Sequence, residues 1–138
     1  MSDKKIHFKV ITHEKIVFDD YVDAIYSNGV DGEFGVLLDH IPFMTALNIG
    51  VTKVEKDGLN DFIATIGGIF QIKENQAVIL TDEAIVGKDI DVARAKQAKE
   101  RAEARLENKN NSNIDTIRAE IALAKALARL KASNYYIK

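Results

Sequence analysis

The side chains of this 138-residue chain that could act together on a ligand are concentrated near its C-terminus. Asp91 and Arg94 are three residues apart, so on a helix they could simply form a local ion pair worth about 0.2–0.5 kcal/mol. Arg94 and Arg101 are separated by about two helical turns and share a face. Lys125 and Arg129, four residues apart, share a face of a later helix. If these faces met, the basic side chains could hold an anion such as a polyphosphate, and charge alone leaves both interpretations open.

Other catalytic and metal-binding chemistries find little support. The chain has no cysteine, which excludes a disulfide framework, a cysteine nucleophile and cysteine-ligated zinc or iron–sulfur centres. Its histidines are His7, His13 and His40, and no two have the i, i+4 spacing of a helical metal site. His40 lies close to Pro42 between two predicted strands, where we expect a structural or interface role. We therefore predict neither a catalytic residue nor a metal site.

The glycine motifs do not point to phosphoryl transfer or to nucleic acids. Gly67-Gly68 lacks the following Gly-Lys-Ser/Thr of a phosphate-binding loop. The tetrapeptide GEFG at residues 32–35 has the spacing of the GXXG loop of some RNA-binding modules, but those modules need flanking helices and this one lies between predicted strands. We expect a tight turn there and no nucleic-acid partner.

The composition changes sharply near Lys88. All eight glycines and the single proline precede residue 89, whereas 11 of the 16 alanines lie at or after it. Residues 1–88 carry 8 basic and 14 acidic side chains, and residues 89–138 carry 11 and 7, so the net charges are −6 and +4. Glycine permits turns and alanine favours helices, so we expect two domains, 1–88 and 89–138. The apolar runs are too short for a transmembrane helix, and the N-terminus lacks the features of a signal peptide.

The first domain reads as a set of short strands. Apolar residues at 6, 8 and 10 alternate with polar ones, and short β-branched or aromatic segments follow. KDG at 56–58 and KENQ at 73–76 are typical of hairpin turns. The pattern predicts an antiparallel sandwich or barrel, with further strands at 16–18, 22–26, 36–38, 44–49, 51–55, 62–66, 69–72 and 78–80.

The second domain reads as two helices. We expect Asp89 to cap a helix from Ile90 to about Glu107, and Ser112 with Asp115 to form a capping box for a second helix over about 114–133. Alanine faces allow close approach but bury little area, so such a hairpin could open. The stripes expected to face each other are Ala95, Ala98, Ala102 and Leu106 with Ile117, Ile121, Ala124 and Ala128.

Several of these segments together resemble the epsilon subunit of bacterial F-type ATP synthase, the counterpart of the mitochondrial delta subunit, over essentially the whole chain. They are GEFGVL at 32–37, HIPF at 40–43, IGGIF at 66–70, Asn75 with VILT at 78–81, and IDVARA at 90–95, which is similar to the Ile/Leu-Asp-x-x-Arg-Ala motif of members that bind ATP. The chain departs from the family at Leu38, where proline is frequent.

The resemblance implies an α+β fold: a flattened antiparallel β-sandwich of about ten strands followed by an antiparallel two-helix hairpin. It implies a non-catalytic central-stalk subunit whose sandwich binds gamma and the c ring, with Glu33 near the c ring and His40 near gamma. The hairpin would reach the alpha and beta subunits when extended and oppose ATP hydrolysis. The protein would lie at the cytoplasmic face of the bacterial plasma membrane without inserting into it.

The resemblance also implies ATP as a regulatory ligand, with no cofactor required. Ile90, Asp91, Arg94 and Ala95 would form the motif. Arg101, Lys125 and Arg129 would add charge, and Lys125 stands where strong binders have arginine. The alternative is a free-standing nucleotide-sensing module without a motor, which co-purification with alpha, beta and gamma would distinguish.

Overall fold

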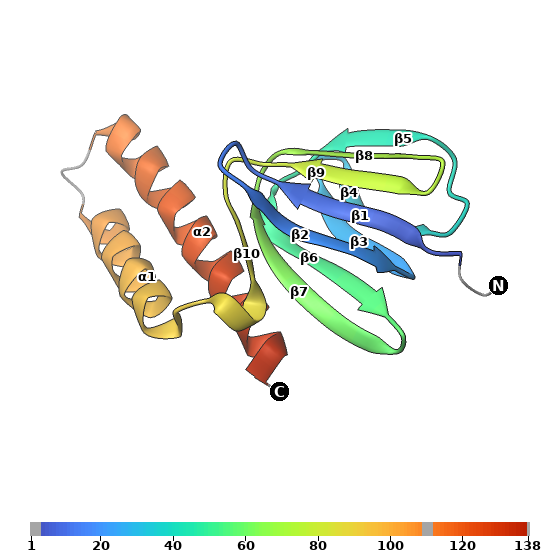
Figure 1. Cartoon of the computed structure of the whole chain (residues 1–138). Coiled ribbons are helices and arrows are strands. Elements are labelled where there is room, and N and C mark those ends of the chain that lie inside the picture. Colours follow the sequence, from blue (N-terminus) through green and yellow to red (C-terminus); the bar gives the residue numbers. More distant parts are fainter. Residues whose placement is uncertain (1–3, 109–111, 138) are drawn as a thin grey trace.

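The computed structural model describes residues 4–108 and 112–137. A β-sandwich is followed by two antiparallel helices, of which the second lies against one side of the sandwich and the first lies against the second (Figure 1). This arrangement confirms the predicted fold class of a sandwich with a C-terminal helical hairpin.

Each sheet of the sandwich has five strands among the described residues. The first sheet has the order β2-β1-β9-β8-β5 and is built from β2 (Ile16–Val22), β1 (Ile6–Ile11), β9 (Gln76–Leu80), β8 (Ile69–Lys73) and β5 (Phe43–Ala46). The second has the order β10-β7-β6-β3-β4 and is built from β10 (Ala84–Val86), β7 (Leu59–Ile66), β6 (Ile49–Lys56), β3 (Ala24–Gly29) and β4 (Gly32–Leu37).

The pairing is antiparallel with one exception. β1 pairs with β9 in parallel, for example Phe8 with Ala77. The predicted antiparallel pairing is confirmed for every other pair of strands in the described residues. Alternation shows which residues face the core but not which strand becomes the neighbour, so it could not predict the parallel pair. The parallel pair joins the beginning of the domain to its last long strand.

Two predicted strands are each divided between the sheets. The chain leaves the first sheet at Val22 and enters the second at Ala24, with a corner at Asp23 whose N–H donates to the Glu55 carbonyl at 2.8 Å. The predicted strand 44–49 is likewise split between β5 and β6. A continuous β-forming run does not reveal that the strand changes sheet.

The core lies between the sheets and follows the predicted alternation. Ile6, Phe8 and Val10 are fully buried with residues of the opposite sheet such as Ile63. A row of buried hydroxyls crosses three strands of the second sheet: Ser27 Oγ lies 2.9 Å from Thr52 Oγ1, which lies 3.2 Å from Thr65 Oγ1. These groups satisfy one another inside an otherwise apolar core.

Both predicted hairpin turns are confirmed. Asp57 and Gly58 have φ of 51° and 80°, and Glu74 and Asn75 have φ of 52° and 59°. These positive values are those of tight turns whose twist matches the paired strands β6–β7 and β8–β9.

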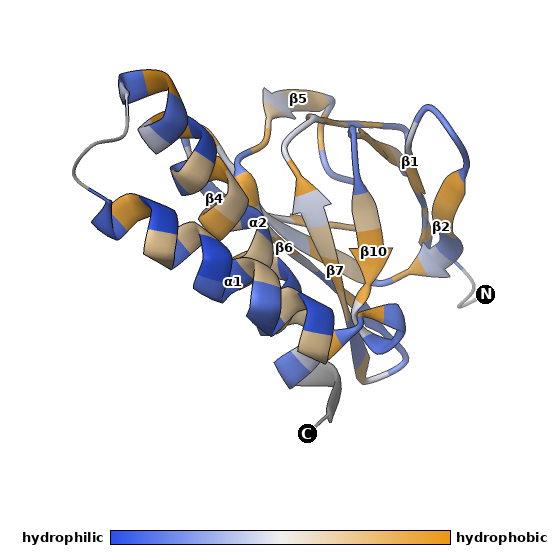
Figure 2. Ribbon diagram, turned by 90° about the vertical axis from the view of Figure 1, so that its left-hand side faces the viewer, coloured by the Kyte–Doolittle hydropathy of each residue, from blue (hydrophilic) through white to orange (hydrophobic). Residues whose placement is uncertain are grey.

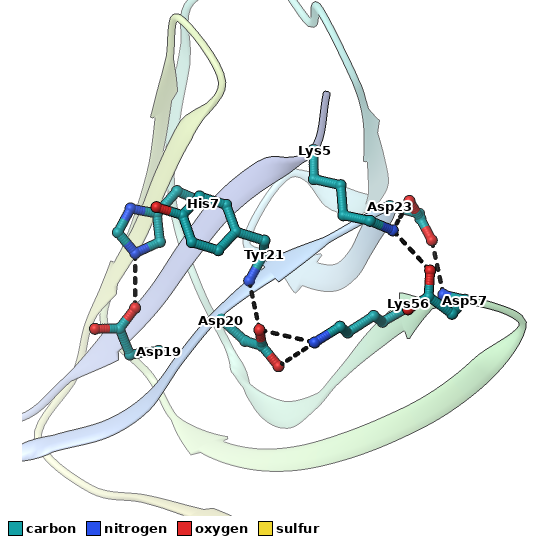
Figure 3. Close-up of polar contacts among 8 residues, drawn as sticks. All are labelled: Lys5, His7, Asp19, Asp20, Tyr21, Asp23, Lys56 and Asp57. Carbon is teal, nitrogen blue, oxygen red and sulfur yellow. Dashed lines mark hydrogen bonds and ion pairs between the residues drawn. The ribbon is translucent and has the colours of Figure 1, made fainter. Parts of the chain in front are cut away.

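Ion pairs connect the two sheets at the β2 edge (Figure 3). Lys56, at the end of β6, lies 2.9 Å from the carboxylate of Asp20 on β2, and lowers the pKa of that carboxyl. Lys5 Nζ lies 2.7 Å from Asp23 and 2.9 Å from Asp57, which holds the pKa of Asp23 below and that of Lys5 above its ordinary value. The corner of the chain is thus fixed to the β6–β7 turn.

The helices are α1 (Val92–Glu107) and α2 (Asn113–Ile137), preceded by a 3-10 turn at Gly87–Asp89. The prediction that Asp89 caps α1 is wrong: the Asp91 carboxylate accepts the N–H of Arg94 at 3.0 Å. Asp89 instead belongs to the 3-10 turn, so helical backbone begins later than expected. The predicted cap of α2 is confirmed, since Ser112 Oγ accepts the N–H of Asp115 at 3.2 Å.

The second helix lies on the outer face of the second sheet, with both helices in front of β6 and β7 in Figure 2. Ala128 and Ala132 pack on Ala64 of β7. Gly87 lets the chain approach closely, because a Cβ there would lie 2.7 Å from the Ala132 carbonyl oxygen.

The predicted seam between the helices is correct on α1 and wrong on α2. Ala95 and Ala102 are buried, but Ile117 and Ile121 are 55% and 44% exposed, and the buried alanines in this part of α2 include Ala119. Because α2 is apolar on several faces, helical spacing alone did not identify the face that meets α1.

Candidate functional site

A groove of about 520 Å³ lies between the start of α1 and α2. It contains three guanidinium groups and two carboxylates, so it combines net positive charge with an apolar wall. Six of the seven residues predicted to bind nucleotide line it: Ile90, Asp91, Arg94, Ala95, Arg101 and Arg129.

The alternative of a side-chain ion pair between Asp91 and Arg94 is not what the structure shows. The Asp91 carboxylate accepts a backbone N–H as the helix cap. Within residues 4–108 and 112–137 the guanidinium groups of Arg94 and Arg101 form no ion pair, and both residues are exposed. Their donors are therefore available to an anion in the groove.

The second helix contributes less to the groove than predicted. Lys125 does not line it; its Nζ lies 3.3 Å from Oε1 of Glu83. Arg129 does line it, but its Nη2 donates to Oε2 of Glu83 at 2.6 Å. Sequence reasoning missed Glu83, because an acidic residue in the β9–β10 connection carries no periodic signal relating it to two helical cations that follow it by 42 and 46 residues.

Glu33 and His40 lie at opposite ends of β4 and do not form one site. Glu33 is exposed opposite Asn28 in the β3–β4 hairpin. His40 follows the strand, and its Nδ1–H donates to the Ile41 carbonyl at 2.7 Å, while its ring centre lies 5.8 Å from that of Phe43. Because a strand rises about 3.3 Å per residue, the length of β4 keeps these two side chains more than about 10 Å apart.

The loop that carries His40 is held in place by its neighbour. Asp39 has φ of 63°, its N–H donates to Asn75 Oδ1 at 2.7 Å, and Asn75 Nδ2 donates back to Asp39 Oδ1 at 3.0 Å. This reciprocal pair ties the β4–β5 connection to the β8–β9 turn, so His40 occupies a fixed position beside the first sheet.

The outer face of the first sheet carries an exposed apolar surface, here called the apolar face. Cross-strand neighbours Ile11, Leu80 and Ile69 form a continuous row, and Met44 lies beside it. Leu80, Ile69 and Met44 are 52%, 47% and 62% exposed. Consecutive apolar residues such as VIL at 78–80 could have predicted this apolar face from the sequence, because neighbouring residues of a strand point to opposite faces and both faces are then apolar. Ile16, on β2 next to Ile11, completes the apolar face.

Two further classes of site find no support in the described residues. No cluster of three or more His, Cys, Asp or Glu side chains in residues 4–108 and 112–137 could hold a metal ion. No helix in the same part of the chain is long and apolar enough to cross a membrane.

Comparison with known families divides the chain where its composition changes. Residues 5–87 match the family model described as "ATP synthase, Delta/Epsilon chain, beta-sandwich domain". Residues 88–134 match the one described as "ATP synthase, Delta/Epsilon chain, long alpha-helix domain".

Individual relatives agree with the family models. The ATP synthase epsilon chain of Desulforamulus reducens is 45% identical over 125 residues, covering 91% of this chain and 94% of that one. The epsilon chain of Nitratidesulfovibrio vulgaris is 38% identical over 129 residues, covering 94% and 96%. A chain in the structure of the Euglena gracilis mitochondrial ATP synthase (OSCP/F1/c-ring) has a TM-score of 0.79 at 26% identity, covering 94% of this chain and 81% of its own. This chain therefore belongs to the family of epsilon subunits of F-type ATP synthase.

Proposed function

We propose that this chain is a non-catalytic coupling and regulatory subunit, which binds gamma through its sandwich and opposes ATP hydrolysis through its hairpin. Membership of the family makes it a central-stalk subunit. The matches to both domains favour this function over a free-standing nucleotide-sensing module. In the assembly the protein would lie peripherally at the cytoplasmic face of the bacterial membrane.

The observation that supports gamma binding is the apolar face. The hairpin covers the second sheet, whereas Leu80, Ile69 and Met44 on the first sheet remain exposed. Large exposed apolar groups on neighbouring strands are typical of interaction surfaces. The c ring would meet the β3–β4 hairpin at Glu33, and His40, held beside the first sheet, would lie at the edge of the gamma interface.

The experiment is co-purification of the full chain with gamma. Leu80→Asp should weaken binding by about 10- to 150-fold, the equivalent of losing about 1.5–3 kcal/mol of leucine burial. Leu59→Asp is the matched control, because Leu59 is 76% exposed on β7, outside the apolar face. Equal retention of gamma by both variants would refute this assignment of the interface.

The other partners can be tested with single cysteines, because the native chain has none. Glu33→Cys should cross-link to a c subunit and His40→Cys to gamma in the assembled synthase. Truncation after Lys88 should retain gamma and raise ATP hydrolysis, because the apolar face lies within residues 1–88 and the hairpin, which would reach alpha and beta, is removed. Unchanged hydrolysis would contradict the inhibitory role.

We propose ATP as the regulatory ligand of the groove beside α1. Three guanidinium groups from two helices can surround a triphosphate, and the apolar wall that includes Ile90 and Ala95 offers a place for the base. A ligand that binds only the docked hairpin would stabilise that state by mass action, so ATP would act against extension.

A further inference from the structure

The helix α2 contributes small side chains to its contact with the sandwich, and the larger apolar residues of that contact, Ile49, Val51, Phe62 and Ile85, are only partly buried. Ala128 and Ala132 contact Ala64, and the backbone at Gly87 approaches that of Ala132. Alanine side chains bury little apolar area compared with the phenylalanine and isoleucine side chains of the sandwich core. Polar contacts at this interface therefore have a large relative influence on whether the hairpin stays docked.

Glu83 supplies the side-chain ion pairs between α2 and the sandwich in the described part of the chain. Its carboxylate accepts from Lys125 Nζ at 3.3 Å and from Arg129 Nη2 at 2.6 Å. We call these three residues the Glu83 cluster. The Glu83 backbone is fixed to the sheet, since its carbonyl accepts the N–H of Ile66 at 3.0 Å and lies 3.2 Å from the Thr81 hydroxyl. The Glu83 carboxylate, fixed beside the start of β10, thus binds two cations of α2, a helix that could otherwise leave the sandwich.

Arg129 could pair with either of two anions, the Glu83 carboxylate or a ligand in the groove. Arg129 bonds to Glu83 and at the same time lines the groove that contains Arg94 and Arg101. A polyphosphate in that groove would meet a guanidinium already engaged by a carboxylate of the protein itself.

We propose that the Glu83 cluster is an electrostatic latch, which keeps the hairpin docked when no nucleotide is bound and which a triphosphate replaces by taking over Arg129. The first part of this proposal, that the Glu83 cluster keeps the hairpin docked, is independent of any ligand. The second part, that a triphosphate replaces Glu83 as the partner of Arg129, is called the replacement step and rests on the proposed binding of ATP.

The expected size of the effect follows from exposure. The side chains of Glu83, Lys125 and Arg129 are 48%, 31% and 30% exposed, so solvent screens both pairs. Exposed pairs change an equilibrium by a small factor, and two pairs on one carboxylate should together shift the open-to-docked ratio about three- to tenfold. The contribution should shrink as ionic strength rises.

The test uses Ala64→Cys in the full chain as a reporter. Ala64 is fully buried beneath α2, so a thiol there reacts only when the hairpin leaves the sheet, and its labelling rate reports the open population. Ala93→Cys, on the exposed side of α1, gives the intrinsic reactivity. In the reporter background, Glu83→Gln should label about three- to tenfold faster than the parent.

The matched control is Asp82→Asn, which removes the same charge from the neighbouring exposed residue without touching α2. Raising the salt concentration should speed labelling of the parent and leave Glu83→Gln nearly unchanged. Arg129→Gln should also open the hairpin, and the double variant should be no more open than the stronger single one, because both remove the same interaction. Equal rates for Glu83→Gln and Asp82→Asn, or additive effects in the double variant, would overturn the latch.

Adding ATP tests the replacement step separately. In the presence of ATP, labelling of Glu83→Gln should slow to the rate seen for the parent with ATP, since the phosphates supply the missing anion. If ATP protects the parent but not Glu83→Gln, Glu83 contacts the ligand and the replacement step is wrong. If ATP protects neither, nucleotide sensing fails, and the nucleotide-free rates still decide the latch.

Discussion

Gly87→Ala should undock the hairpin by steric means alone. The added Cβ would lie 2.7 Å from the carbonyl oxygen of Ala132 on α2 and 3.1 Å from that of Phe62 on β7. Both are backbone atoms, so no side chain can rotate away. Gly87 does not have positive φ, so alanine can adopt its backbone conformation and the cost comes from the contacts alone.

The magnitude follows from the geometry of this contact. A Cβ normally keeps more than 3.4 Å or so from such atoms, so α2 must move by several tenths of an ångström away from the sheet. Overpacking of this kind costs about 1–3 kcal/mol, which would raise the open-to-docked ratio about 5- to 160-fold.

The assay is thiol labelling at Ala64→Cys, with Lys88→Ala as the control. Lys88 is the exposed neighbour in the same 3-10 turn, so its substitution leaves the α2 contact intact. Unlike the effect of Glu83→Gln, the effect of Gly87→Ala should persist at high salt, because steric contact is not screened. Labelling of Gly87→Ala at the parent rate would show that the hairpin does not depend on this close approach.

Three further outcomes are expected. Thr52→Val should lower the free energy of unfolding in urea by about 1–3 kcal/mol, because it leaves two buried hydroxyls without the partner they have in the second sheet. Lys56→Met should make the stability of the protein fall less steeply in acid, as measured by thermal unfolding at a series of pH values. The lowered pKa of Asp20 stabilises the fold above the ordinary pKa of 3.8, and this contribution is lost as the pH falls through the pKa of Asp20 in the folded state. In calorimetry with ATP, Arg94→Ala should reduce affinity about tenfold or more, and Lys125→Ala should reduce it less because Lys125 does not line the groove.

The sequence predicted the features that depend on local chemistry. The turns at 56–58 and 73–76 form as expected because Asp57, Gly58 and Asn75 tolerate positive φ. The alternation of Ile6, Phe8 and Val10 correctly identified the buried face of the first strand. The alanine content correctly identified the helical half of the chain.

Features that depend on three-dimensional placement escaped the sequence analysis. Nothing local distinguishes Asp23, where the chain changes sheet, from any other polar residue inside a strand. Glu83 reaches the α2 cations because the β9–β10 connection lies beside the helix, and Lys125 turns toward that carboxylate instead of the groove. Of the four cations predicted to converge, Arg94, Arg101 and Arg129 line one groove and Lys125 does not.

The two halves of the molecule differ in how strongly they are held together, and this difference bears on regulation. The sandwich joins its sheets through large, fully buried side chains such as Phe8, Phe70 and Ile63, and deleting one such group costs about 3–5 kcal/mol. The hairpin meets the sandwich through Ala128 and Ala132, which pack on partly buried apolar residues of β6 and β7, and through an exposed ion-pair cluster. Undocking therefore costs much less than unfolding, and the hairpin can leave while the apolar face, formed only by strands of the sandwich, keeps its shape. Under the proposed function, the hairpin would therefore leave the sandwich while the apolar face stays bound to gamma.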